Sequence, residues 1–258
     1  MIPLQHKNKK CKIYHYCPCW AFENIIRTKE LWFSSEQNSN DAIEFQIPEK
    51  VLQRLKQDSK LQSKHSFIDS CITYLQKQRK NFFTMSFSLG ADQLSQWRSY
   101  ADDGRGFAIG TEVSLNYIQD FAQTPNIQKN SSFVFIQVDY DNVSKLQNKF
   151  RYHLKNIQTE LEKKQFKQDL LYYAVASKYC KFYEEREVRL VCLNPKTTKI
   201  RLSPYGMRPY ITYPLDETQA LNVMIGPKNK CKEKDIKKFL QIHGFNNVNV
   251  SSAIQHYK

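Results

Sequence analysis

The stretch Glu187-Val188-Arg189-Leu190-Val191-Cys192-Leu193 opens the part of the chain that decides the fold class. Its β-branched and apolar residues are typical of a strand. Similar segments follow at 200–202 and 220–225, and a helix around 235–242 precedes a last strand near 248–251. Strand segments outnumber regular strand–helix–strand alternations. This pattern favours an α+β fold with mixed or antiparallel sheets and flanking helices over a doubly wound parallel sheet.

The N-terminal two thirds of the chain predict both strands and helices. Apolar residues at helical spacing predict a helical insertion at about 48–80 with a break near 62–65, and one long helix at about 145–180, bent near Gln165. Further helices are expected after Pro18 and at 92–100. The remaining strands are expected at 13–16, 31–34, 82–87, 107–110 and 133–140.

Nothing in the sequence marks a domain boundary. The 258 residues contain seven glycines and nine prolines, with no Gly/Ser-rich linker and no internal repeat. We therefore expect a single domain over 1–258.

The chain is strongly basic, with a formal net charge of +14. Such a charge attracts polyanions, either nucleic acid or the phosphates of a nucleotide. A generally Lys-rich proteome from an AT-rich genome would give the same charge, so both interpretations stay open at this point.

Hydropathy and cysteine usage predict a cytoplasmic protein without a membrane contact. No apolar run approaches the roughly 18 residues that span a bilayer, and residues 1–12 are polar and basic, unlike a signal peptide. The seven cysteines are an odd and scattered set, which fits a reducing compartment. Cys17-Pro18-Cys19 lacks a second pair at zinc-finger spacing, and no phosphate-binding loop or nucleophile elbow is present.

Four clusters of polar residues could form a functional site, and a purely structural role is an alternative interpretation for each. In the first, Tyr14-His15-Tyr16, strand geometry sends both tyrosines to one face and His15 to the other, toward a cleft or into a satisfied core position. In the second, Asp41 and Glu44 follow a turn and share a helical face, or else form a helix cap.

The third cluster is Gln96-Trp97-Arg98-Ser99-Tyr100-Ala101, followed by a turn that contains Arg105. Trp97 and Tyr100 could form a stacking surface beside the cation of Arg98. Alternatively, Trp97 and Ala101 are the buried face of a short helix.

The fourth cluster, Glu184-Glu185-Arg186-Glu187-Val188-Arg189, would place Glu185, Glu187 and Arg189 on one face of a strand. Neighbouring carboxylates repel unless a cation or a substrate relieves them. Glu185 and Glu187 are therefore the strongest candidates for a functional site, with a charged edge strand as the alternative.

Taken together and in this order, the landmarks of the chain resemble the bacterial family called domain of unknown function 2971. Two positions depart from the usual family pattern: Ala42 stands where a proline is usual, and Val188 where a tryptophan is usual. The landmarks are Ile13-Tyr14-His15-Tyr16, Asn40-Asp41 with Glu44, Met85-Ser86-Phe87-Ser88, Gln96-Trp97-Arg98-Ser99-Tyr100-Ala101, Gly106, Glu185-Arg186-Glu187-Val188-Arg189, Arg208-Pro209-Tyr210-Ile211, Val223-Met224-Ile225-Gly226-Pro227 and Ser252-Ala253-Ile254.

The layout is also similar to that of ADP-ribosyltransferases, whose split sandwich carries His or Arg on an early strand and a catalytic Glu on a late one. This resemblance implies that NAD is the substrate, that Glu187 is catalytic, and that Glu185 positions the acceptor. It implies His15 as a catalytic and NAD-binding residue. The other residues implied to bind NAD are Tyr16, Ser34, Trp97, Arg98 and Tyr100, and those implied for the acceptor or substrate are Asp41, Glu44, Arg105 and Arg189.

The leading functional expectation is therefore an NAD-consuming ADP-ribosyltransferase-like effector, a toxin or antiphage component, with nucleic acid as a candidate acceptor and an inhibitory or sensor protein as a candidate partner. One alternative is a non-catalytic nucleic-acid-binding module. The other is a metal-dependent nuclease that uses Asp41, Glu44, Glu185 and Glu187.

Overall fold

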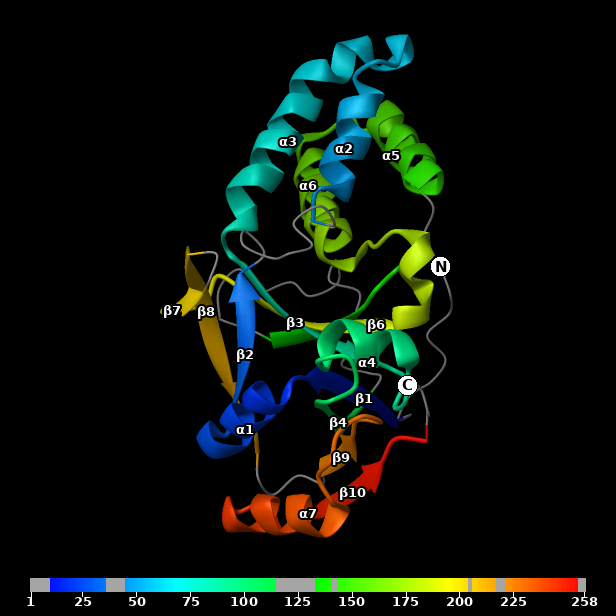
Figure 1. Cartoon of the computed structure of the whole chain (residues 1–258). Helices are drawn as coiled ribbons and strands as arrows, with labels where there is room; N and C mark the ends of the chain where they lie inside the picture. The colour runs from blue at the N-terminus through cyan, green and yellow to red at the C-terminus, as the bar shows by residue number, and fades with distance from the viewer. Residues whose placement is uncertain are drawn as a thin grey trace.

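The computed structural model describes residues 10–35, 45–114, 133–140, 143–203, 206–216 and 221–254. Helices and strands alternate irregularly along these segments (Figure 1). The helices are α1 (Cys19–Thr28), α2 (Ile47–Leu55), α3 (His65–Arg79), α4 (Leu94–Tyr100), α5 (Val143–Asn156), α6 (Glu160–Ala176), α7 (Glu233–Ile242) and the 3₁₀ helices η2 (Ser59–Lys64) and η5 (Cys180–Glu185). The strands are β1 (Lys10–Cys17), β2 (Glu30–Ser35), β3 (Phe82–Ser88), β4 (Phe107–Ser114), β5 (Phe133–Gln137), β6 (Glu187–Leu193), β7 (Lys199–Ser203), β8 (Gly206–Pro214), β9 (Leu221–Ile225) and β10 (Val248–Ser252).

The strands form one sheet in the order β10-β9-β4-β1-β3-β2-β8-β7, and β6 joins it through β3 and also pairs with β5. The pairs are antiparallel except β9 and β10, which run parallel. The predicted α+β class with mixed and antiparallel strands and flanking helices is thus confirmed. The ADP-ribosyltransferase-like split sandwich stays a prediction.

Strand β3 is the place where β1 and β2 separate. One edge of β3 pairs with β6 over its full length, from Phe82 to Ser88. Its other edge pairs with β2 at Phe83 and Thr84, and with β1 at Ser88. The backbone around Ser86 therefore lies between two diverging strands, and its polar groups need partners other than a strand.

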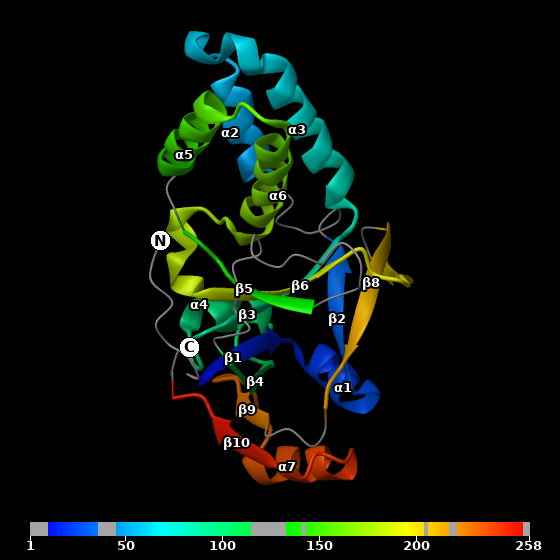
Figure 2. The same cartoon turned by 180° about the vertical axis from the view of Figure 1, so that it is seen from behind.

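Two large cores lie on the two sides of β3 and β6. The helices α2, α3, α5 and α6 gather on one side of the sheet (Figures 1 and 2) and bury Val191 and Leu193 of β6 with Phe82 of β3. The second core includes residues of α1 and α7 together with Val188 and Leu190. Because β6 is buried along its whole length, any polar residue on it must find partners inside the protein.

The single long helix expected at about 145–180 is two helices, and this prediction is wrong. Helix α5 ends at Asn156, and α6 begins at Glu160 behind a capping box in which Thr159 and Glu162 bind each other's backbone N–H groups. Gln165, where a bend was predicted, lies inside α6, and the chain instead interrupts the helix between Asn156 and Glu160. The helical insertion lies near its predicted position, with η2 between α2 and α3.

None of the helices in the described segments is both long and apolar enough to cross a bilayer.

Candidate functional site

Glu187 is the first residue of β6, and it is almost completely buried, at 4% exposure. Alternation along the strand turns Glu187 and Arg189 to one face and Val188 and Leu190 to the other, into an apolar core. Arg189 is also buried. A carboxylate and a guanidinium therefore lie together inside the protein, where each needs a specific partner.

Four hydrogen bonds and ion pairs hold the Glu187 carboxylate. Its Oε1 accepts from Ser86 Oγ at 2.5 Å and from Arg189 Nε at 2.8 Å. Its Oε2 accepts from Arg189 Nη2 at 3.1 Å and from Lys178 Nζ at 3.1 Å. Both oxygens are thus bound by charged or hydroxyl donors, which are the strong kind of hydrogen bond for a carboxylate.

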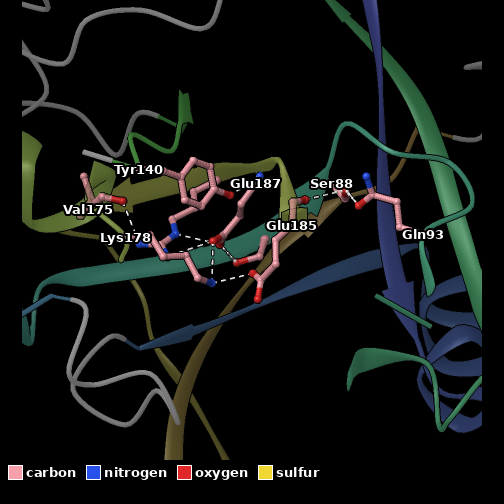
Figure 3. Close-up of polar contacts among 9 residues, drawn as sticks. Ser88, Gln93, Tyr140, Val175, Lys178, Glu185 and Glu187 are labelled. Carbon is pink, nitrogen blue, oxygen red and sulfur yellow. Dashed lines mark hydrogen bonds and ion pairs between the residues drawn. The ribbon is translucent and has the colours of Figure 1, made fainter. Parts of the chain in front are cut away.

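Lys178 joins the two glutamates of the motif (Figure 3). Its buried Nζ donates to Glu185 Oε2 at 2.6 Å as well as to Glu187. Tyr140 Oη accepts the backbone N–H of Glu187, and the carbonyl of Val175 accepts from Arg189. We call Lys178, Glu185, Glu187 and Arg189 the buried ion cluster; its two carboxylates and two cations sum to zero charge.

The cluster keeps Glu187 ionised. Burial alone would raise the pKa of this carboxyl group, but the charges of Arg189 and Lys178, with the hydrogen bond from Ser86, outweigh burial and lower the pKa from 4.5 to about 2. The carboxylate is therefore negatively charged at neutral pH.

Ser86 is an exposed neighbour of this carboxylate. Ser86 is solvent-exposed although its hydroxyl contacts the buried Glu187. Thr84 and Tyr14, which share this face of the sheet, are half-buried. A small polar group that took the place of the Ser86 hydroxyl would contact Glu187 Oε1.

His15 and Glu187 do not face a shared cavity, which corrects the expectation that both would bind NAD there. His15 alternates with Tyr14 and Tyr16, and its ring packs edge-on against Phe87 in the apolar core, at 5.8 Å between centroids. Its Nδ1 donates to the backbone carbonyl of Ser86 at 3.0 Å, at the place on β3 where β1 and β2 separate. His15 is thus linked to Glu187 through Ser86.

Trp97 cannot stack on a ligand in this conformation, so that expectation is wrong. It is fully buried with Ala101, and its Nε1 donates to Asp92 at 2.6 Å. Tyr16 is also buried, packs against the Trp97 ring, and donates from its hydroxyl to the carbonyl of Gly90. The alternative reading of Trp97 as the buried face of a short helix is the correct one.

The other predicted residues of this region are spread over several places. Arg98, Tyr100 and Arg105 are exposed on or just after α4, and Arg105 pairs weakly with Asp102 at 3.8 Å. Ser34 lies on the same face as Ser86, since it is paired with Thr84, and its hydroxyl accepts from Arg201. Asp41 and Glu44 lie outside the described residues.

Two predicted roles within the Glu motif also change. Glu185 is not on the strand: it ends η5, and Arg186 follows it with a left-handed backbone, φ 46°. Arg189 donates hydrogen bonds to the Glu187 carboxylate and to the Val175 carbonyl. It therefore stabilises the carboxylate and is not available to bind a phosphate.

Sequence reasoning missed Lys178, the cation that relieves the repulsion between Glu185 and Glu187. A signal for it was present, because Lys178 follows the apolar run Ala174-Val175-Ala176 at the end of a helix, where a lysine is rarely buried without a carboxylate partner. Across the described segments, no three His, Cys, Asp or Glu side chains gather as metal ligands would.

Residues 96–190 match the family described as Protein of unknown function (DUF2971). The resemblance predicted from the sequence is confirmed over this segment, which runs from α4 into β6 and includes Trp97, Lys178 and Glu187. No curated protein matches the chain, and no solved structure does.

Proposed function

We propose that this protein is an NAD-consuming enzyme of the ADP-ribosyltransferase kind, with Glu187 as the catalytic carboxylate. The observation that carries the proposal is the state of Glu187: it is ionised inside the protein, with one oxygen next to the hydroxyl of an exposed serine, Ser86. Perturbed carboxylates beside solvent are more frequent at functional sites than elsewhere. NAD is then a substrate, and no resident cofactor is required.

The reaction would break the bond between nicotinamide nitrogen and ribose carbon. Nicotinamide leaves with the electron pair of that bond, and the ribose carbon becomes electron-poor until a nucleophile of the acceptor attaches and loses its proton. A carboxylate that accepts a hydrogen bond from a ribose hydroxyl stabilises this positive charge. The ribose hydroxyl would replace Ser86 Oγ at Glu187 Oε1.

His15 acts in this proposal as a positioning residue. It fixes the carbonyl of Ser86 where β1 and β2 separate, and so fixes the hydroxyl that holds Glu187. The partly exposed side chains beside this hydroxyl, Tyr14 and Thr84, are the nearest candidates to contact the nucleotide on the same face.

A metal-dependent nuclease is less well supported. Glu185 and Glu187 are already neutralised by Lys178 and Arg189, so they offer little net charge to a divalent cation.

Within the proposed function, the enzyme acts as a cytoplasmic toxin or antiphage effector, and an inhibitory or sensor protein holds it in check.

Nicotinamide release tests the proposal. Purified protein with NAD should release nicotinamide, and Glu187→Gln should reduce the rate by at least about a hundredfold, because the amide carries no charge to stabilise the ribose cation. Glu184→Gln is the matched control, since Glu184 is exposed in the same motif. The proposal fails if the wild-type protein is inert with both protein and nucleic-acid acceptors, or if folded Glu187→Gln keeps full activity.

A further inference from the structure

Strands β2, β8 and β7 at one end of the sheet present a cluster of aromatic and cationic side chains. The Trp32 and Tyr210 rings lie 5.0 Å apart, between centroids. The guanidinium carbon of Arg201 lies 5.8 Å from the Trp32 ring and 6.0 Å from the Tyr210 ring, and Arg201 Nη2 donates to Ser34 Oγ at 3.1 Å. We call Trp32, Ser34, Arg201 and Tyr210 the Trp32–Arg201 cluster.

Strand pairing puts the members of this cluster on one face. Ser34 is opposite Tyr210 on β8, Tyr210 is opposite Lys199 on β7, and Arg201 is opposite Arg208. The four members of the cluster are half-buried, so each keeps some surface in contact with solvent. The result is an open strand face with aromatic rings in its middle and cations along its edge.

The positive charge of Arg201 is the feature of this face that points to an anionic ligand. Arg201 lies directly opposite Arg208 on the strand pair, and like charges in such positions repel each other. Arg201 has no carboxylate partner among the residues that the structure describes; it forms one hydrogen bond there although a guanidinium carries five N–H donors. Lys199 pairs with Glu30 at 3.4 Å, both partly exposed, which is a weak interaction.

Trp32 adds a second unsatisfied group. Its Nε1 is buried and has no hydrogen-bond partner in the described part of the chain, which is unusual for a buried donor. The guanidinium of Arg201 lies over the same ring. If Arg201 turned outward to a phosphate, the face of the indole ring that it covers would become accessible to a nucleobase.

We propose that the Trp32–Arg201 cluster binds single-stranded nucleic acid, with a base on Trp32 and Tyr210 and phosphates on Arg201, Arg208 and Lys199. Stacking aromatics flanked by arginine are a general mode of binding single strands. A strand fits better than a free nucleotide because the cations succeed one another along an open hairpin, and the chain as a whole carries +14.

The inference deepens the proposed function by naming the acceptor class, and it rests on that function for the transfer step. Binding itself requires no NAD, so the two can fail separately. A protein that binds single strands but releases no nicotinamide would refute the enzyme and keep the binding site. An active enzyme that does not bind single strands would refute the acceptor.

Fluorescence anisotropy with a labelled single-stranded oligonucleotide tests the binding. Arg201→Ala should weaken binding by about tenfold, which is the order of one lost stacking and phosphate contact. Arg201→Lys should recover part of the loss, because it keeps the charge but not the planar stacking group. Arg54→Ala is the matched control, since it removes one exposed positive charge on α2, in the helical layer.

Three outcomes would overturn the inference: equal losses in Arg201→Ala and Arg54→Ala, a preference for duplex, or full competition by a mononucleotide at the same nucleotide concentration. Tyr210→Leu is a second variant that leaves every charge in place, and it should also weaken binding severalfold. Thermal unfolding of each variant shows whether it is folded before its binding is compared.

Discussion

At the scale of single residues, Glu187 couples the stability of the fold to acid. Its pKa is about 2 in the folded protein and 4.5 for the unperturbed group. The contribution of this carboxylate to the free energy of unfolding is therefore fully present above pH 4.5. It is lost as the pH falls toward 2, because the unfolded chain binds the proton more tightly. With about 1.4 kcal/mol per pKa unit, the loss is on the order of 3 kcal/mol.

Urea unfolding of the wild-type protein and of Glu187→Gln between pH 2 and 7 measures this effect. The wild-type protein should lose stability more steeply across this range than the variant, which has no carboxyl at position 187. At neutral pH the variant should be the less stable of the two, by a few kcal/mol, because Lys178 and Arg189 lose their shared anion. Parallel pH curves for the two proteins would contradict the prediction.

His15 should give a second pH dependence, at higher pH. Burial lowers the pKa of its imidazole below 6.5, although the hydrogen bond to the Ser86 carbonyl partly opposes burial. The contribution of His15 to stability is complete above pH 6.5 and declines as the pH falls below it, because the unfolded chain takes up a proton that folded His15 resists. His15→Gln should remove this decline, and an NMR titration that placed the pKa of His15 above 6.5 would disprove it.

The sequence predicted how side chains alternate along β1, but not which strands lie beside one another. Alternation correctly separated His15 from Tyr14 and Tyr16 on β1. Which of the two faces also carries Glu187 depends on the pairing of β3 with β6, between residues about a hundred positions apart, and a single sequence contains no local signal for that register. Glu187 was identified because its charge chemistry is local to its motif.

At the scale of elements, two glycines, one on β4 and one just before it, lie in close contact with residues of β1. A Cβ at Gly106 would lie 2.1 Å from the backbone carbonyl oxygen of Cys17, and backbone cannot easily move. A Cβ at Gly110 would meet the ring of Tyr14 at 2.6 Å, and a half-buried side chain can turn away.

Gly106→Ala should therefore lower the free energy of unfolding by about 3 kcal/mol or more, as overpacking against rigid backbone does. Gly110→Ala should cost about 1 kcal/mol or less, because the Tyr14 ring can shift at small cost. Chemical denaturation of both variants and of the wild-type protein measures the difference. Equal costs would mean that β1 and β4 separate more readily than their pairing indicates.

At the same scale, one long helix was predicted where the protein has two, α5 and α6. Leu146, Phe150 and Leu154 of α5 and Phe166 and Leu170 of α6 enter the same core, so the apolar stripe continues across the break. Periodicity reports which face is buried and does not report whether one helix or two bury it. The Thr-x-x-Glu capping box at 159–162 was the available signal for a helix start.

At the scale of the whole molecule, composition and strand count were enough for the α+β class, while the strand order was not predictable. Neighbours such as β2 and β8, or β4 and β9, are joined by pairing between segments far apart in the sequence. The order therefore results from how the two cores are filled, and these cores gather side chains from both halves of the chain.

The two cores should unfold together, as expected for the predicted single domain. Strands β3 and β6 contribute Phe82 and Val191 to one core and Phe87 and Val188 to the other, so neither core can open without disturbing the strands that support its neighbour.

Leu154→Ala in the helical core should lower stability by about 2 to 5 kcal/mol. It should also shift the helical circular dichroism and the tryptophan fluorescence transitions by the same amount, because the cores share the strands β3 and β6 and unfold together. Fluorescence is an independent probe here, since the buried Trp97 lies in a smaller apolar cluster that does not include Leu154. The control, Leu161→Ala, removes the same side chain from an exposed position of α6 and should change little. A shift of the dichroism transition alone would show that the helices form a separate folding unit, and the single-domain prediction would then be wrong.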